Sequence, residues 1–393
     1  MAAARKIVRK VIFEPLKAFI HDSRSIGISL LLATLLSLIL SNTDGISENY
    51  TRFFQLSIDG TLEHAFELGP FHLPNSIIVV INDLFMAAFF FLAGMEIKRE
   101  LITGELASIK QSILPVAAAI GGMIVPALIY TQFNRGTEYI GGWAIPMATD
   151  IAFTLGIASL LGNRVPVALK VFITALAIID DLGAIVVIAL FYGSQLKLFY
   201  LLLSGVIILI LLSLQKNKVK IGWYTWLLGI LLWYTMFNSG IHATVAGVLF
   251  ALTIPVNKLP ELEMKFHTPV YFIIMPLFAL ANTAIILPES GLNALNNTFS
   301  AGIIAGLFIG KPMGICLACY WMIKKKWAQL PNHTNWHQMI GAGILAGIGF
   351  TMSIFISMLA FSENTTQDIA KIAVLVSSVF SMLIGYAWMA IKK

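Results

Sequence analysis

Long apolar runs separated by short polar connections recur along the whole chain. Charge-free stretches such as 25–43, 111–134 and 372–391 are each long enough to cross a lipid bilayer as an α-helix. The pattern predicts about twelve such spans, near 25–41, 77–97, 112–132, 139–160, 168–192, 198–214, 221–236, 240–255, 267–287, 299–322, 340–361 and 370–390. We therefore expect an all-α polytopic membrane protein.

Composition agrees with this class. Of the 393 residues, 58% are hydrophobic and 12% are charged, whereas soluble domains are about one quarter charged. The spans leave no room for a separate soluble domain. We expect an N-terminal cytoplasmic segment (1–24), one integral-membrane domain (25–390) and a C-terminal cytoplasmic tail (391–393).

Basic residues are distributed unevenly between the two sides of the predicted membrane. Of the 26 Lys and Arg, 21 fall on the side that carries both termini, four fall on the other side, and Lys311 lies within a span. By the positive-inside rule the side rich in Lys and Arg is cytoplasmic. The net charge of +6 therefore reflects membrane topology and does not resemble a nucleic-acid-binding face.

The longest outer connection, 42–76, contains two alternating segments. Residues 53–58 and 66–73 read as strands, and Asp59-Gly60 between them reads as a hairpin turn. Such a ribbon is marginal alone and could pair with its copy in a second protomer. The alternative is a disordered polar loop.

Five charged residues lie well inside the predicted spans, away from the span ends. They are Asp83, Asp150, Asp180, Asp181 and Lys311. A charge at a helix centre costs about 2.5 to 3.5 kcal/mol unless it is compensated, so pairing or function must offset this cost. Asp180 and Asp181 diverge by about 100° on a helix, so both can reach one cavity through different contacts. Their oxygens suit a hard cation, and burial beside a like charge favours their protonated form. A site that takes either a cation or protons is what an exchanger needs. The alternative is a carboxylate pair locked in salt bridges.

Two predicted spans, the fourth and the eleventh, contain helix-breaking sequences. Gly141-Gly142 and Pro146 precede Asp150, and a glycine-rich stretch runs from Gly341 to Ser353. Broken helices expose carbonyls and helix ends to a cavity, where Thr149 could add an oxygen. Asp150 could neutralise facing helix N-termini and Lys311 facing C-termini, or Lys311 could pair with Asp180 or Asp181. A kinked but continuous fourth span is the alternative.

Other polar groups carry weaker signals. Charged residues beside the second and ninth spans are either solvated flanking charge or a pH-sensing cluster; they are Glu96, Arg99, Glu100 and Glu263. His242 is either a titrating or a structural residue. Cys316-x-x-Cys319 lacks the further ligands of a zinc site, and Gly310-Lys311-Pro312 lacks the Ser or Thr of a phosphate loop. We expect no cofactor. An intramembrane aspartyl enzyme would need two aspartates across a cleft, and no Gly-x-Gly-Asp supports it, so we expect no enzyme.

Several motifs together resemble the NhaA family of sodium/proton antiporters over nearly the whole chain. They are Asp180-Asp181, Ala148-Thr149-Asp150, Gly310-Lys311-Pro312, 239–244 and 347–353. The resemblance implies an inverted-repeat transporter in which Asp180 and Asp181 carry Na⁺ or Li⁺ and protons. It puts Thr149 and Asp150 beside them and makes Lys311 the functional lysine.

The same resemblance implies a homodimer in a bacterial inner membrane, with electrogenic exchange that is activated at alkaline pH. Its funnel and pH-response residues would be Asp83, Glu96, Arg99, Glu100 and Glu263, with His242 near the outer face. Met264 departs from the family, whose members can have histidine there. Our hypothesis is export of Na⁺ or Li⁺ against proton entry. The alternative is a sodium-coupled symporter of an organic solute, which would need a larger polar cavity.

Overall fold

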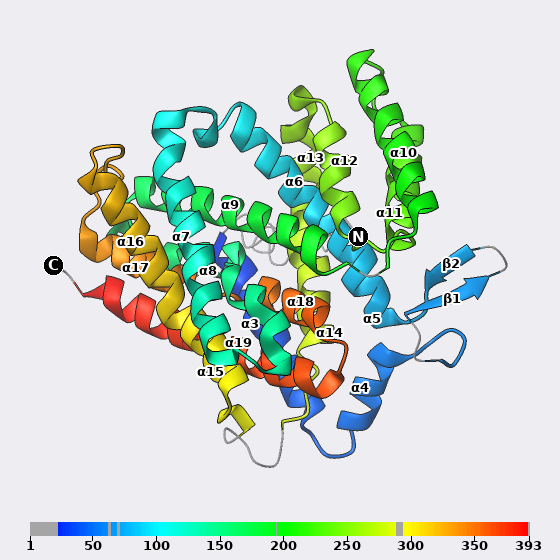
Figure 1. Ribbon diagram of the computed structural model, residues 1–393, viewed down its shortest axis with the longest axis horizontal. Helices are drawn as coiled ribbons and strands as arrows, with labels where there is room; N and C mark the ends of the chain where they lie inside the picture. The colour runs from blue at the N-terminus through cyan, green and yellow to red at the C-terminus, as the bar shows by residue number, and fades with distance from the viewer. Residues whose placement is uncertain (1–22, 62–63, 69–70, 194, 288–293, 392–393) are drawn as a thin grey trace, which may run out of the picture.

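Apolar helices make up most of the protein in its computed structural model (Figure 1). The structure describes residues 23–61, 64–68, 71–193, 195–287 and 294–391. Most of the expected N-terminal segment 1–24 and of the tail 391–393 lies outside the described residues. In the described part, seven helices are long and apolar enough to cross a membrane, or nine if two bent pairs each count as one span.

The α-helices and the two strands have the following bounds: α3 Ser23–Ser41, α4 Ser47–Gln55, β1 Ala65–Leu68, β2 Phe71–Pro74, α5 Ile77–Val79, α6 Met86–Ile102, α7 Ile109–Asn134, α8 Ile151–Leu160, α9 Val167–Phe191, α10 Leu198–Lys216, α11 Trp223–Phe237, α12 Val245–Thr253, α13 Leu259–Pro269, α14 Met275–Asn282, α15 Thr298–Ala305, α16 Lys311–Lys324, α17 Trp336–Ala346, α18 Phe350–Ala360 and α19 Asn364–Ala390. Segments of 3₁₀ helix are η3 Glu105–Ala107, η4 Glu138–Met147, η5 Gly162–Arg164 and η6 Val256–Lys258. Segments of π-helix are η2 Val80–Phe85, η7 Val270–Ile274 and η9 Gly306–Gly310.

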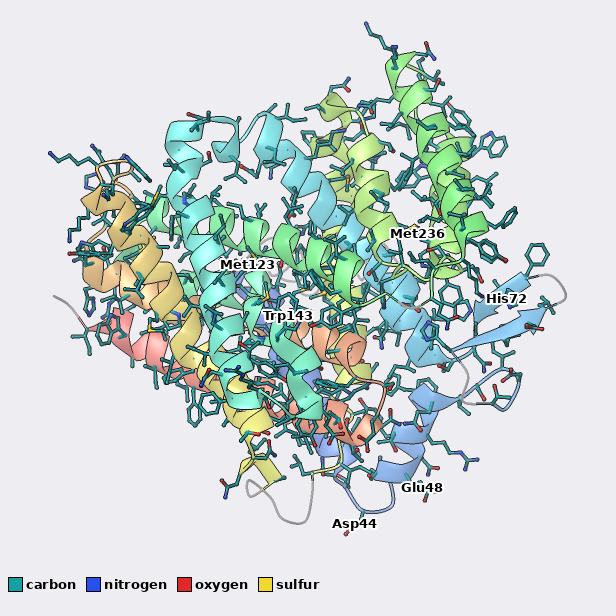
Figure 2. All side chains as sticks on the ribbon, viewed as in Figure 1. Asp44, Glu48, His72, Met123, Trp143 and Met236 are labelled. Atoms are coloured by element: carbon teal, nitrogen blue, oxygen red, sulfur yellow. The ribbon has the colours of Figure 1, made fainter. Side chains whose placement is uncertain are left out.

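A β-hairpin projects from the helical body, but it does not lie where the sequence pattern predicted it (Figures 1 and 2). β1 and β2 pair antiparallel with Phe66 opposite Leu73. The expectation of a strand over 53–58 and a turn at Asp59-Gly60 was wrong, because residues 47–55 form α4. Tyr50 and Phe54 are four residues apart and pack edge to face at 5.4 Å, with Phe54 buried. This is the helical spacing, and it overrides the short alternation that follows.

Two pairs of helices meet at sharp bends. The segments η4 and α8 are bent by 43° across 148–150, and α17 and α18 are bent by 43° across 347–349. Pro146 and the glycines Gly347 and Gly349 account for the loss of regular helix at these points. The bends lie in the two stretches in which the sequence predicted interruptions.

The long helices that carry η7 and η9 widen just before a proline. Pro276 follows η7 and Pro312 follows η9. A proline ring crowds the carbonyl four residues earlier and removes one hydrogen bond, so the preceding turn opens. Tyr271 lies in the first of these wide turns, and Lys311 directly follows the second.

Close glycine contacts fix the helix that carries Lys311. A Cβ on Gly314 would collide with the carbonyl of Gly121, so α16 packs backbone to backbone against α7. A Cβ on Gly310 would likewise come too close to the backbone of Pro126 in the same helix, at 2.9 Å. Helix α9 lies in the interior: 61% of its apolar stretch is buried, whereas only 17% of the apolar stretch of α10 is buried. The charges of α9 and α16 therefore meet inside the protein.

Candidate functional site

Hydrogen bonds join the two helix breaks. The backbone N–H of Asp150 donates to the carbonyl of Ile348 at 2.7 Å. The Ser353 hydroxyl donates to the carbonyl of Ile145 at 2.7 Å, and the Thr154 hydroxyl donates to that of Leu345 at 3.1 Å. Side chains and extended backbone thus satisfy groups that a bilayer interior would leave unpaired.

Asp150 lies between the N-termini of two half-helices. Its carboxylate accepts a hydrogen bond at 3.0 Å from the N–H of Phe153 in α8, and another at 3.1 Å from the N–H of Thr351 in α18. The hydroxyl of Thr351 also donates to it. The positive ends of two helix dipoles therefore face one buried negative charge.

Lys311 takes both of the roles between which the sequence could not choose. Its ammonium lies 2.7 Å from Asp180 Oδ2, with both side chains fully buried, and it donates to the carbonyl of Met147, where η4 ends. It therefore pairs with a carboxylate and neutralises a helix C-terminus. The Thr149 hydroxyl lies 2.8 Å from the same Asp180 oxygen and 3.0 Å from the carbonyl of Ala346.

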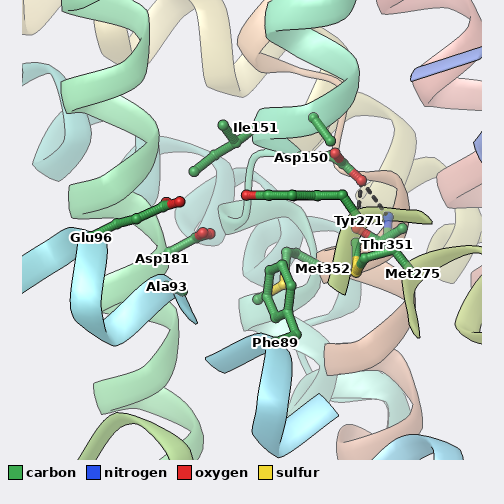
Figure 3. A pocket seen from close by; sticks show the side chains of 11 residues that line it. Phe89, Ala93, Glu96, Asp150, Ile151, Asp181, Tyr271, Met275, Thr351 and Met352 are labelled. Carbon is green, nitrogen blue, oxygen red and sulfur yellow. Dashed lines mark hydrogen bonds between the residues drawn. The ribbon is translucent and has the colours of Figure 1, made fainter. Parts of the chain in front are cut away.

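Asp181, the residue next to Asp180, lines a narrow cavity (Figure 3). Its Oδ1 atom is buried and has no hydrogen-bond partner within the described residues, and the same holds for Asp180 Oδ1. An unpaired carboxylate oxygen in an apolar interior is costly unless a proton or a cation joins it. The space for the centre of a water-sized sphere is about 20 Å³, enough for about one water molecule.

Charged residues at the C-terminal end of α6 form a second group. Arg99 Nη1 lies 2.6 Å from Glu100, and Arg99 Nε lies 2.9 Å from Glu263 of α13. Glu96, one turn earlier, lines the Asp181 cavity. Met264, at the position where the sequence departs from the family, is 74% exposed, so its side chain points away from this group.

The residues that the resemblance assigns to the funnel and pH response do not form one cluster. Asp83 lies near the opposite end of the same helical stretch, where its Oδ1 is 3.6 Å from His242 Nε2. Sixteen residues of helix between Asp83 and Arg99 correspond to about 24 Å. Asp83 and His242 therefore belong to the end that carries the hairpin, since His64 beside β1 contacts Asp83, and Arg99 and Glu263 belong to the other end.

Sequence reasoning missed two residues at these sites. His64, just before β1, lies 2.7 Å from Asp83 Oδ2 and stacks on Phe237 at 5.4 Å. Tyr271 lines the cavity of Asp181. Neither carries a sequence signal, because a loop histidine and an aromatic in an apolar run are ordinary.

Buried charges at the ends of two bent helix pairs, beside carboxylate oxygens that have no partner within the described residues, are typical of a membrane transporter of ions. Comparison with known proteins narrows this class. Residues 17–389 match the family described as Na⁺/H⁺ antiporter 1, and the chain belongs to this family.

The relatives agree with this assignment along their whole length. The chain is 47% identical to Na(+)/H(+) antiporter NhaA 2 of Flavobacterium johnsoniae, with 94% of this chain and 92% of that one covered. It is 44% identical to Na(+)/H(+) antiporter NhaA of Cytophaga hutchinsonii, with 95% and 94% covered. It is also 44% identical to the protein of that name in Escherichia coli O1:K1, with 96% and 98% covered. These names describe transporters and not enzymes.

Proposed function

We propose that the protein exports Na⁺ or Li⁺ in exchange for protons, at a site formed by Asp181, Asp180, Thr149 and Asp150. The observation that carries this proposal is the Asp181 oxygen that has no partner among the residues the structure describes, in a narrow cavity beside the buried pair of Lys311 and Asp180. A cation and a proton would compete for the same carboxylate oxygens, because either one satisfies the buried charge.

Charge balance at the site supports coupled exchange. Two helix N-termini face the Asp150 carboxylate. Apart from Asp150, the carboxylates of Asp180 and Asp181 and the ammonium of Lys311 carry a net charge of −1 when no ion is bound. One Na⁺ cancels that charge, whereas the two carboxylates together can accept more than one proton. Exchange of one Na⁺ for more than one proton would be electrogenic, and each charge moving inward gains about 2.3 kcal/mol per 100 mV. Arrival of a cation or a proton at Asp180 would release Lys311.

The architecture that we propose has twelve spans with both termini in the cytoplasm of a bacterial inner membrane. The shorter helices α3, α11 and α12 would complete the nine spans counted by length and composition. The projecting hairpin would pair with its copy in a homodimer, since Leu68 and Phe71 are 60% and 54% exposed. Glu96, Arg99, Glu100 and Glu263 would then respond to cytoplasmic pH and raise activity under alkaline conditions.

A test of the function is the collapse of a pH gradient in everted membrane vesicles on addition of Na⁺, Li⁺ or K⁺ across a pH series. We expect Na⁺ and Li⁺ to collapse the gradient, increasingly as the pH rises, and K⁺ to have no effect. In proteoliposomes, clamping the membrane potential at different values should change the rate. A rate independent of potential would refute electrogenic exchange. Solute-dependent currents without proton movement would favour the symporter, although the cavity has room for only about one water molecule.

The contact between His64 and Asp83 predicts that the hairpin is held more firmly at acidic pH. Partial desolvation lowers the pKa of His64, but the neighbouring Asp83 carboxylate outweighs it, so the pKa lies above its usual value. The contact therefore stabilises fully below the usual pKa and is lost as the pH rises through the raised value. In wild type we expect slower hydrogen exchange of β1 and β2 at about pH 5 than at about pH 9, after correction for intrinsic rates.

His64→Gln should remove this pH dependence, because glutamine does not titrate. His72→Gln is the matched control, since His72 lies 3.5 Å from Glu67 within the hairpin and does not tie the hairpin to Asp83. The nearby His242 also faces Asp83, so a pH dependence that survives in His64→Gln would assign the effect to His242 and contradict the prediction.

A further inference from the structure

A tyrosine lies in the cavity of Asp181 that neither the sequence motifs nor the exchange scheme uses. Tyr271, in the wide turn η7, lines this cavity together with Glu96, Asp150 and Asp181. Figure 3 shows its ring lying across the cavity with the hydroxyl directed toward the carboxylates of Glu96 and Asp181.

The shape of the helix brings the ring into this position. Tyr271 lies between Pro269 and Pro276, in the π-helical turn that the second proline opens. The ring of His267 packs against it with centroids 4.8 Å apart. The phenol is therefore fixed at one end, while its oxygen lies in the cavity.

The other oxygens that line the cavity are not equally available to an ion. Both oxygens of Asp150 are engaged by the N-termini of α8 and α18. The Thr351 hydroxyl donates to Asp150 and so belongs to the same network. The remaining oxygens are those of Asp181, Glu96 and Tyr271, and the rest of the lining is mostly apolar, with Phe89, Met275 and Met352 among it.

A cation that enters must exchange its water for protein oxygens. The cavity has only about 20 Å³ for the centre of a water-sized sphere, which is less than a hydrated ion needs. A hydroxyl presents lone pairs to a cation and carries no charge, so it can replace a water between two carboxylates without adding a further negative charge. A small hard cation favours such oxygen ligands.

We infer that Tyr271 is a cation-binding residue whose hydroxyl replaces one water of Na⁺ or Li⁺ as the ion passes between Glu96 and Asp181. This inference rests on the proposed exchange of Na⁺ for protons at Asp181. It adds a neutral ligand to the site and makes the approach from the Glu96 end selective for small cations. The proton branch of the cycle does not use this hydroxyl.

The test is Tyr271→Phe, which removes the hydroxyl and keeps the ring. We expect the apparent KM for Na⁺ and Li⁺ to rise about tenfold, because an interaction with a charged group contributes about that factor. The maximal rate at saturating Na⁺ should stay near that of wild type. Tyr234→Phe is the matched control, since Tyr234 packs on Phe71 of the hairpin at 6.3 Å, away from the cavity, and its KM should not change.

Two further measurements separate binding from packing and from transport. Tyr271→Leu removes the ring as well as the hydroxyl. If KM changed in Tyr271→Leu but not in Tyr271→Phe, the ring would act through packing, and the inference would be overturned. Stabilisation of the purified protein by Na⁺ or Li⁺ in detergent reports binding alone. If the wild type moved no protons, the exchange proposal would fail. The stabilisation assay would still test whether Tyr271 binds the cation. Equal stabilisation of wild type and Tyr271→Phe would refute the cation-binding role.

Discussion

Asp181→Asn should abolish the collapse of a pH gradient by Na⁺ and Li⁺ at every pH. Asparagine keeps the size of the side chain but loses the charge that holds the cation, and removing a charged partner from a buried site costs about 3 kcal/mol or more, roughly 100-fold in binding. The measurement is the rate in everted vesicles across a pH series, normalised to the amount of inserted protein.

The same variant should fold at least as well as the wild type. Asp181 Oδ1 is buried without a partner within the described part of the chain, so replacing the carboxylate removes a destabilising group. Asp368→Asn is the matched control, because Asp368 is 40% exposed beside Lys371 and lies outside the cavity. Exchange that persists in well-folded Asp181→Asn would remove this residue from the site.

Lys311→Met should destabilise the protein strongly. The ammonium lies 2.7 Å from Asp180 with both side chains fully buried, and removing one partner of a buried ion pair costs about 3 to 5 kcal/mol. The measurement is thermal unfolding in detergent. The loss should shrink at acidic pH, because a protonated Asp180 no longer needs a counter-charge. Lys324→Met, at the end of α16, should change stability by less than about 0.5 kcal/mol.

Adding Asp180→Asn to Lys311→Met should restore most of the lost stability, because the carboxylate that Lys311 compensates is then removed with it. Neither the single nor the double variant should exchange Na⁺. If the double variant were as unstable as the single one, the hydrogen bond from Lys311 to the Met147 carbonyl, and not the ion pair, would be the stabilising interaction.

The sequence was informative wherever one helix or one side chain carried the signal. Apolar runs predicted the helices, and the rarity of charge inside them singled out Asp150, Asp180, Asp181 and Lys311, all of which are buried in the structure. Proline and glycine indicated where the two bends lie. These are local properties, since a buried charge is costly whatever its partner is.

The sequence was misleading where two local patterns competed. Residues 53–58 alternate, yet Tyr50 and Phe54 share a helical spacing that packing selects. The hairpin forms further along, with Phe66 opposite Leu73. A short strand is decided by the surface on which it lies, and that surface comes from other parts of the chain.

What the sequence by itself determined is a chain of apolar helices with a few charges that must be compensated or used. Only the tertiary structure decided that Lys311 joins Asp180 and the end of η4, that the Asp83 and Arg99 groups lie at opposite ends, and that His64 and Tyr271 enter the two sites. The physical reason is that the cost of a buried charge belongs to one residue, whereas its compensation depends on distance to residues from other helices.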